Sequence, residues 1–145
     1  MIRRNLLDLN VLIALTDDSH QQYERAWSWL RASGQQSWGL CPLTEAGYVR
    51  VTTNPAAHSG ARTLAKSAAV LRELMREPGY CYWPIAESWA TLTAPFADRI
   101  FGHQQVTDAY LLGLAIKEDG LLVTFDRGLK YMAGAEFSRN LLVLE

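Results

Sequence analysis

Short apolar runs alternate with longer amphipathic stretches along the whole chain. Runs rich in aliphatic, aromatic or β-branched residues and bounded by polar or turn residues predict strands at 3–8, 37–43, 80–85, 121–126 and 140–145. The stretches between these runs place apolar residues three and four positions apart, which is the spacing of amphipathic helices. Alternating strands and helices are typical of a parallel sheet covered on both faces. The chain is therefore predicted to form a three-layer α/β/α fold with a central parallel sheet.

Capping residues and prolines predict where the helices of the first half begin and end. Asn10 caps the helix that follows the first strand. The second helix lies between Ser19 as its N-cap and Gly34 as its stop. A third begins at Pro42 and ends near Pro55, because proline suits the first turn of a helix and cannot continue one.

The second half of the chain carries three more helical stretches. A helix over 61–77 has Leu64 on its apolar face. The helical stretch over 86–102 is interrupted by Pro95, whose ring removes a backbone hydrogen bond. Thr107 caps the last predicted helix, which leads into the strand at 121–126.

Length and composition are those of one cytoplasmic domain. With 145 residues, 49% of them hydrophobic, residues 1–145 are expected to form a single domain with its own core. Cys41 and Cys81 lack a paired metal spacing and no signal-peptide pattern opens the chain, so we expect a reducing compartment and buried, inert cysteines. No apolar stretch reaches the roughly 18 residues of a bilayer span. The net charge of -1 excludes a global attraction to nucleic acid.

Four carboxylates lie at the ends of apolar elements. Asp8 and Asp126 each follow a predicted strand, and Glu45 and Asp108 each lie in the first turn of a predicted helix. Taken singly, each has an ordinary explanation, since aspartate favours turns and an acid in a first turn complements the helix dipole. Taken together, the four carboxylates are expected to lie at one edge of the sheet, where ligands of parallel α/β folds bind.

Crowded carboxylates repel one another, so such a cluster is costly unless a cation neutralises it. Oxygen ligands without matching Cys or His favour Mg²⁺, or Mn²⁺ in its place, over Zn²⁺. Mg²⁺ keeps several waters, which bind phosphate oxygens or supply the nucleophile. The acids therefore favour metal-dependent hydrolysis of phosphodiesters.

Four segments carry a family resemblance. They are "LLDLNVLIAL", "CPLTEAGYVRV", "QVTDAYLLGLA" and "LLVTFDRGL". In order and spacing they resemble the acidic signature segments of PIN-domain ribonucleases, and among these the VapC toxins of bacterial type II toxin–antitoxin systems. The resemblance covers nearly the whole chain. It implies an Mg²⁺-dependent endoribonuclease that forms a homodimer and is held inactive by a small VapB-type antitoxin.

The resemblance also implies roles for single residues. Asp8 and Asp108 match the principal metal ligands, and Glu45 and Asp126 match acids that hold coordinated waters or a second, weaker ion. All four therefore count as catalytic candidates. Three polar residues match positions beside the site and are expected to orient the carboxylates, namely Asn10, Thr44 and Thr124. Arg127, next to the fourth acid, is a weaker candidate.

Other conspicuous residues favour ordinary roles. The histidines, His20, His58 and His103, lie in polar contexts typical of surfaces, with an RNA contact left open for His103. Trp27, Trp29 and Trp89 suit base stacking, but their helical spacing favours the core or a dimer interface. Scattered basic residues could form a phosphate-facing rim around the site, but such residues usually make an ordinary solvated surface. They are Arg50, Arg62, Arg99, Arg127 and Lys130.

Two other functions remain alternatives. A phosphotransferase that forms an acyl phosphate also has an aspartate after its first strand. Its chemistry requires a second carboxylate two residues later, where this chain has Asn10. A PIN-like module that binds RNA or protein without cutting is the second alternative, and the presence of all four acids disfavours it. The sequence leaves open which RNA is cut, at which sequence it is cut, which antitoxin binds and how many metal ions are held.

Overall fold

The computed structural model describes residues 3–33, 37–58 and 60–145, and in this part the strands form one four-stranded sheet. All strand pairs are parallel, and the order is β2-β1-β3-β4. The strands are β1 (Asn5–Leu7), β2 (Trp38–Gly39), β3 (Leu121–Thr124) and β4 (Leu141–Val143). The predicted parallel sheet is confirmed, with each strand shorter than its apolar run.

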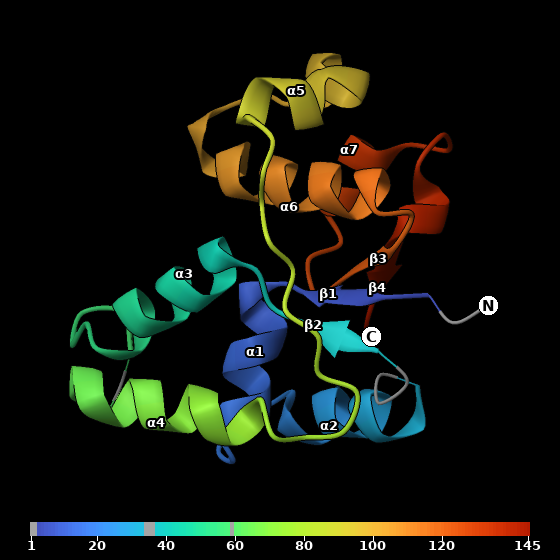
Figure 1. Ribbon diagram of the computed structural model, residues 1–145. Coiled ribbons are helices and arrows are strands. Elements are labelled where there is room, and N and C mark those ends of the chain that lie inside the picture. The colour runs from blue at the N-terminus through green and yellow to red at the C-terminus, as the bar shows by residue number, and fades with distance from the viewer. Residues whose placement is uncertain (1–2, 34–36, 59) are drawn as a thin grey trace.

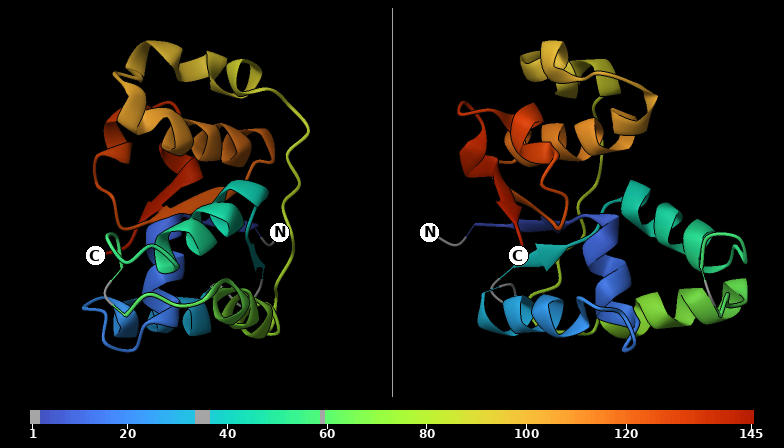
Figure 2. Two further views of the ribbon diagram at one scale, coloured as in Figure 1. Left: turned by 90° about the vertical axis from the view of Figure 1, so that its left-hand side faces the viewer. Right: turned by 180° about the vertical axis from the view of Figure 1, so that it is seen from behind.

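Helices cover both faces of the sheet (Figures 1 and 2). One layer contains α1 (Leu9–Thr16), α2 (Tyr23–Ala32), α3 (Pro42–Thr52) and α4 (Leu64–Leu74). The other contains α5 (Trp89–Thr93), α6 (Val106–Lys117) and α7 (Leu129–Ala133). Short 3₁₀ turns, η2 (Ala94–Arg99), η3 (His103–Gln105) and η4 (Ser138–Asn140), join the elements of this second layer.

Each layer encloses its own hydrophobic core against the sheet. Trp38, Tyr48 and Leu12 are fully buried in the first core, and Trp83, Phe96 and Leu112 are fully buried in the second. The three-layer α/β/α architecture is confirmed. None of the helices in the described part of the chain is long and apolar enough to cross a membrane.

An extended segment beside β2 takes the place of the strand expected at 80–85. The amide of Cys81 donates to the carbonyl of Trp38 at 2.8 Å, and the amide of Trp83 donates to the carbonyl of Leu40 at 2.9 Å. Tyr80 pairs with Trp38 in the parallel sense. The segment approaches so closely that a Cβ on Gly39 would lie 1.8 Å from the carbonyl oxygen of Cys81.

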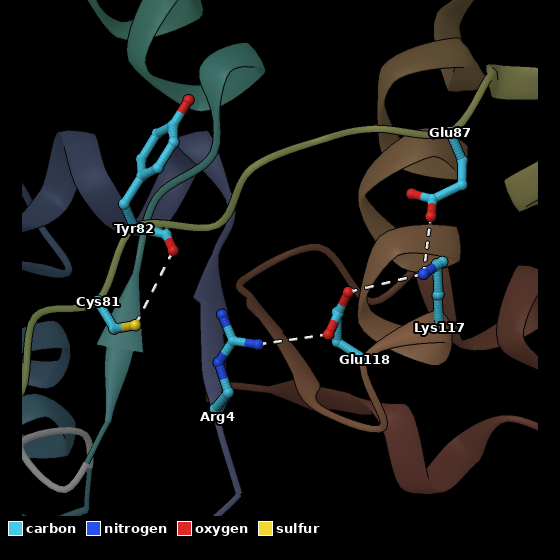
Figure 3. Close-up of polar contacts among 6 residues, drawn as sticks. All are labelled: Arg4, Cys81, Tyr82, Glu87, Lys117 and Glu118. Atoms are coloured by element: carbon cyan, nitrogen blue, oxygen red, sulfur yellow. Dashed lines mark hydrogen bonds and ion pairs between the residues drawn. The ribbon is translucent and has the colours of Figure 1, made fainter.

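Ion pairs hold the continuation of this segment against the sheet and α6 (Figure 3). Lys117 lies 2.7 Å from Glu87 and 4.0 Å from Glu118, and Arg4 lies 3.4 Å from Glu118. The guanidinium of Arg4 also stacks over the ring of Trp83 at 4.3 Å. Because these charges are partly exposed, each pair contributes little, and the chain of pairs mainly fixes the path of the segment.

Three predicted helix caps are wrong. Asp8, not Asn10, is the N-cap of α1, since its carboxylate accepts from the amide of Leu9. Ser19 bonds to Asp17 in the turn before α2, which begins later than predicted. Thr107 lies inside α6, because a 3₁₀ turn starts the helix earlier. Gly34, the predicted stop of α2, lies outside the described residues.

Two predictions of burial also differ from the structure. Leu64 is exposed, because α4 begins at this residue and turns Ser67, Leu71 and Leu74 inward instead. Cys41 is buried as expected, but Cys81 is exposed, since it lies on the outer segment beside β2.

Candidate active site

Asp8 lies where β1 ends and α1 begins, with 6% of its surface exposed. One carboxylate oxygen accepts from the amide of Leu9 at 2.7 Å, and the other accepts from the hydroxyl of Thr124 at 2.8 Å. Capping the helix explains the backbone bond. It does not require the second bond to a residue at the end of a neighbouring strand, which fixes the orientation of the carboxylate.

Thr124 connects three of the predicted site residues. Its fully buried hydroxyl donates to Asp8, accepts from the side-chain amide of Asn10 at 3.1 Å and accepts from the backbone amide of Asp126 at 3.0 Å. A hydroxyl has one donor and two acceptor positions, so all its bonding capacity is used. Asn10 in turn accepts from the amide of Phe125 at 3.2 Å. The loop after β3 is therefore tied to the start of α1.

Asp108 and Asp126 line one pocket of about 260 Å³ between the start of α6 and the loop before α7. Asp126 accepts from the amide of Gly128 at 2.8 Å, which closes the turn that follows the strand. The other lining residues, Gln104, Gln105, Gly128, Leu129 and Met132, were not predicted. Gln104 and Gln105 lie one helical turn before Asp108, and that spacing was the sequence signal for them.

The charges of three aspartates act on one another. Burial and, to a smaller extent, the nearby charges of Asp8 and Asp126 together raise the pKa of Asp108 to about 7. Burial also raises the pKa of Asp8, against the lowering effect of its hydrogen bonds to Thr124 and Leu9, and the charge of Asp126 adds to the rise. The structure thus brings Asp8, Asp108 and Asp126 together at the end of β1 and β3.

The charge of Glu45 acts on two tyrosines and not on the three aspartates. Burial is the cause that raises its pKa, and its charge raises the pKa of Tyr80 and Tyr82 instead of those of the aspartates. Figure 3 shows the ring of Tyr82 pointing toward α3, whose first turn carries Glu45. The hydroxyl of Thr44 accepts from the amide of Cys41 at 3.0 Å, so Thr44 supports the start of α3 and does not contact the other acids. Figure 1 shows α3 beginning on the side of the sheet at which β1 ends.

The aspartates suit a hard cation that keeps most of its water. Within residues 3–33, 37–58 and 60–145, no three Asp, Glu, His or Cys side chains are close enough together to hold one ion by themselves. Mg²⁺ does not need such a cage, because it is commonly held by one or two carboxylates together with water and substrate phosphate. The raised pKa of Asp108 fits this donor set, since a carboxylate that is partly buried and near other carboxylates holds its proton when no cation neutralises it.

The tryptophans and two of the five basic residues, Arg62 and Arg99, have structural roles. Trp29 is buried, and the indole groups of Trp27 and Trp89 donate to backbone carbonyls at 2.9 Å. Arg62 donates to the carbonyl of Thr16 at 3.0 Å, and Arg99 donates to the carbonyl of Met132 at 2.8 Å. These side chains hold elements together and do not form a rim around the pocket.

Comparison with known proteins assigns the family. Residues 6–135 match the family described as PIN domain. Ribonuclease VapC38 of Mycobacterium tuberculosis is 41% identical over 128 residues, which cover 88% of this chain and 89% of the relative. Ribonuclease VapC39 of the same species is 36% identical over 130 residues, 90% of this chain and 94% of the relative.

Solved structures agree with the fold. VapBC2 from Rickettsia felis, bound to a DNA fragment from their promoter, aligns with a TM-score of 0.66 at 11% identity and covers 97% of this chain and 98% of that one. FitAcB from Neisseria gonorrhoeae aligns with a TM-score of 0.58 at 19% identity, and the alignment covers 97% of this chain and 96% of that one. The chain is therefore a PIN-domain ribonuclease of the VapC family, the toxins of type II toxin–antitoxin systems.

Proposed function

We propose that this ribonuclease hydrolyses single phosphodiester bonds within RNA with one Mg²⁺ ion, or Mn²⁺ in its place, held by Asp8 and Asp108. The observation that carries the proposal is the convergence of three aspartates: Thr124 bonds to the carboxylate of Asp8 and to the amide of Asp126, and Asp126 shares a pocket with Asp108. Acids that repel one another inside a fold are a cost to stability, and a catalytic cation explains why they lie together. The alternative of a PIN-like module that only binds leaves this cost unexplained.

Each residue of the site has a distinct part. When bound, Mg²⁺ neutralises charge on the phosphate and makes a coordinated water more acidic. Thr124 keeps the carboxylate of Asp8 in place, and Asn10 keeps Thr124 in place. Asp126, the exposed carboxylate of the three, is suited to accept a proton from the water that attacks phosphorus while the bond to the 3′ oxygen breaks. Glu45 acts from the first turn of α3 through intervening water.

Removal of the metal tests this proposal directly. Cleavage of a mixed RNA substrate should stop in EDTA and return when Mg²⁺ or Mn²⁺ is added in excess, because the aspartates by themselves cannot neutralise the phosphate charge. Asp8→Asn, purified in parallel, should stay inactive after the metal is restored, which excludes a contaminating nuclease. Undiminished cleavage in EDTA would rule out the metal-dependent mechanism.

Metal affinity should depend on pH. Asp108 has a pKa of about 7 without metal, so below pH 7 a proton occupies the carboxylate and competes with the cation. Mg²⁺ affinity, measured by calorimetry, is expected to fall about tenfold for each pH unit below 7 and to level off above it. Asp108→Asn should remove this dependence, and an unchanged profile in that variant would assign the proton to another group.

The partner and the cellular setting are proposals that follow from the family. The related solved structures include VapBC complexes, which supports a VapB-type antitoxin as the inhibitor of this chain. We further propose that residues 1–145 act as one domain, that the chain forms a homodimer and that it meets its RNA in the cytoplasm. Co-expression with the product of a short upstream reading frame should relieve growth arrest and yield a stable complex.

A further inference from the structure

Two aromatic side chains beside the acid pocket are unusually exposed. Phe101 is 69% exposed and Tyr131 is 63% exposed. Their rings lie 5.4 Å apart between centroids, tilted by 38°. Large aromatic side chains normally bury most of their surface, so a pair in mutual contact that leaves both rings in water has an outer apolar face without an intramolecular use. We call Phe101 and Tyr131 the aromatic pair.

The aromatic pair is joined to the acid pocket by the elements that carry it. Phe101 begins the turn that leads into η3, and its amide donates to the side chain of Gln105 at 2.6 Å. Gln105 lines the acid pocket together with Asp108, and also lines a shallow hollow that includes Phe101. Tyr131 lies in α7 next to Met132, another residue of the acid pocket. The two rings thus meet from the two segments that enclose the pocket.

Weakly engaged cations lie on the same segment as Tyr131. Arg127 precedes Tyr131 by four residues, and Lys130 precedes it by one. Both side chains are well exposed, and among the described residues each forms an ion pair only with the same oxygen of Glu145, at 4.0 Å. Exposed pairs at this distance contribute little, so both cations are available to a phosphate. Arg62 and Arg99, by contrast, bond to backbone carbonyls of the fold.

We propose that the aromatic pair is a stacking platform for an unpaired RNA base next to the scissile phosphate, with Arg127 and Lys130 holding the adjoining backbone. This inference rests on the proposed function, since it places the base beside the acids that cut. Proteins recognise single-stranded RNA by stacking bases on exposed aromatic rings and by pairing phosphates with basic side chains. A base within a duplex is already stacked on its neighbours, so the platform selects unpaired regions such as loops.

The test measures binding without cleavage. Wild-type protein and Phe101→Ala, Tyr131→Ala and Tyr131→Phe variants are titrated with a fluorescent 2′-O-methyl RNA oligonucleotide in EDTA. Each alanine variant should bind about tenfold more weakly, and Tyr131→Phe should bind as wild type does, because the ring and not the hydroxyl stacks. Leu64→Ala, which truncates an equally exposed side chain on α4, is the control and should not change binding.

An abasic scan separates stacking from a structural effect. A series of oligonucleotides lacks one base at a time, and at one position the loss caused by Phe101→Ala should disappear, because the stacked base is already absent. If the alanine variants bind like wild type, or lose affinity equally at every abasic position, the platform is refuted. A changed oligomeric state in sedimentation, with unchanged RNA binding, would show that the pair belongs to a protein interface.

The same experiments distinguish this proposal from the proposed function. Cleavage of RNA by wild-type protein with Mg²⁺, combined with unimpaired binding by the alanine variants, would leave the nuclease in place and overturn only the platform. Base-dependent binding to the pair in a protein that cuts no RNA would support the platform and contradict the nuclease. A duplex oligonucleotide should bind wild type and Phe101→Ala equally.

Discussion

Asp108→Asn is expected to abolish most RNA cleavage and at the same time to stabilise the metal-free protein. Loss of a metal ligand should lower the cleavage rate about a thousandfold, since metal stabilisation of phosphate charge is worth several kcal/mol. The fold should be preserved, because Asn has nearly the same shape as Asp. Cleavage is measured with Mg²⁺ at pH 8, and stability is measured by urea unfolding in EDTA.

The stability gain follows from the pKa of Asp108. Its pKa is 3.8 when unperturbed and about 7 in the fold, so between pH 4 and pH 7 the folded protein keeps a proton that the unfolded chain releases. The free energy of unfolding therefore falls as pH rises through this window, and the loss is complete above pH 7. Asn carries no charge, so Asp108→Asn removes this loss of stability. We expect a gain of about 1 to 2 kcal/mol at pH 8 after allowing for partial exposure, and none at pH 4.

Asp18→Asn is the matched control, because Asp18 is an exposed aspartate in the turn between α1 and α2. It should change neither cleavage nor the pH dependence of stability. If Asp108→Asn destabilised the metal-free protein at pH 8, Asp108 would have a structural role and its place in a metal site would be wrong. Full activity in both Asp108→Asn and Asp8→Asn would contradict the assignment of the site.

Gly39→Ala is expected to cause a large loss of stability, because among the glycines compared Gly39 has the closest neighbour to an added Cβ. The new Cβ would meet the carbonyl oxygen of Cys81 at 1.8 Å and the ring of Trp83 at 2.7 Å. Backbone cannot yield as a flexible side chain does, so the segment beside β2 must move away and lose its hydrogen bonds to Trp38 and Leu40. We expect the free energy of unfolding to fall by about 3 to 5 kcal/mol, measured by urea titration.

Gly102→Ala provides the comparison for this substitution. No atom lies within 4 Å of a Cβ placed at Gly102, whose φ of 179° is ordinary extended backbone. The free energy of unfolding of the Gly102→Ala protein should differ from that of wild type by less than about 0.5 kcal/mol. A Gly39→Ala protein as stable as wild type would mean that residues 79–83 do not pack beside β2 in solution.

Most strands and helices were predicted correctly, because the spacing of apolar residues along a segment differs between strands and helices. The run from Asn5 to Leu7 is buried at every residue, as is typical of a strand in a parallel sheet that is covered on both faces. The helix caps were predicted less well. Asn10 has the right chemistry for a cap, but the residue that ends the strand, Asp8, lies one step before the helix and takes that role.

The family resemblance predicts the four acids as site residues, but their grouping depends on the tertiary structure. Asp8, Asp108 and Asp126 act on one another, whereas Glu45 acts on Tyr80 and Tyr82. The sequence carries no information about this difference, because Glu45 and Asp108 both lie in the first turn of a helix and yet act on different groups. The distances between their charges depend on how α3 and α6 pack against the sheet.

By itself the sequence determined the alternation of strands and helices, the parallel sheet and the residue types that a nuclease of this family requires. Periodicity and local chemistry suffice for these, since they act over a few neighbouring residues. Only the tertiary structure decided that Thr124 holds Asp8, that the charge of Glu45 acts on Tyr80 and Tyr82 and that Phe101 meets Tyr131 in the open. Such contacts join residues far apart in the chain, and their geometry arises only when the helical layers close on the sheet.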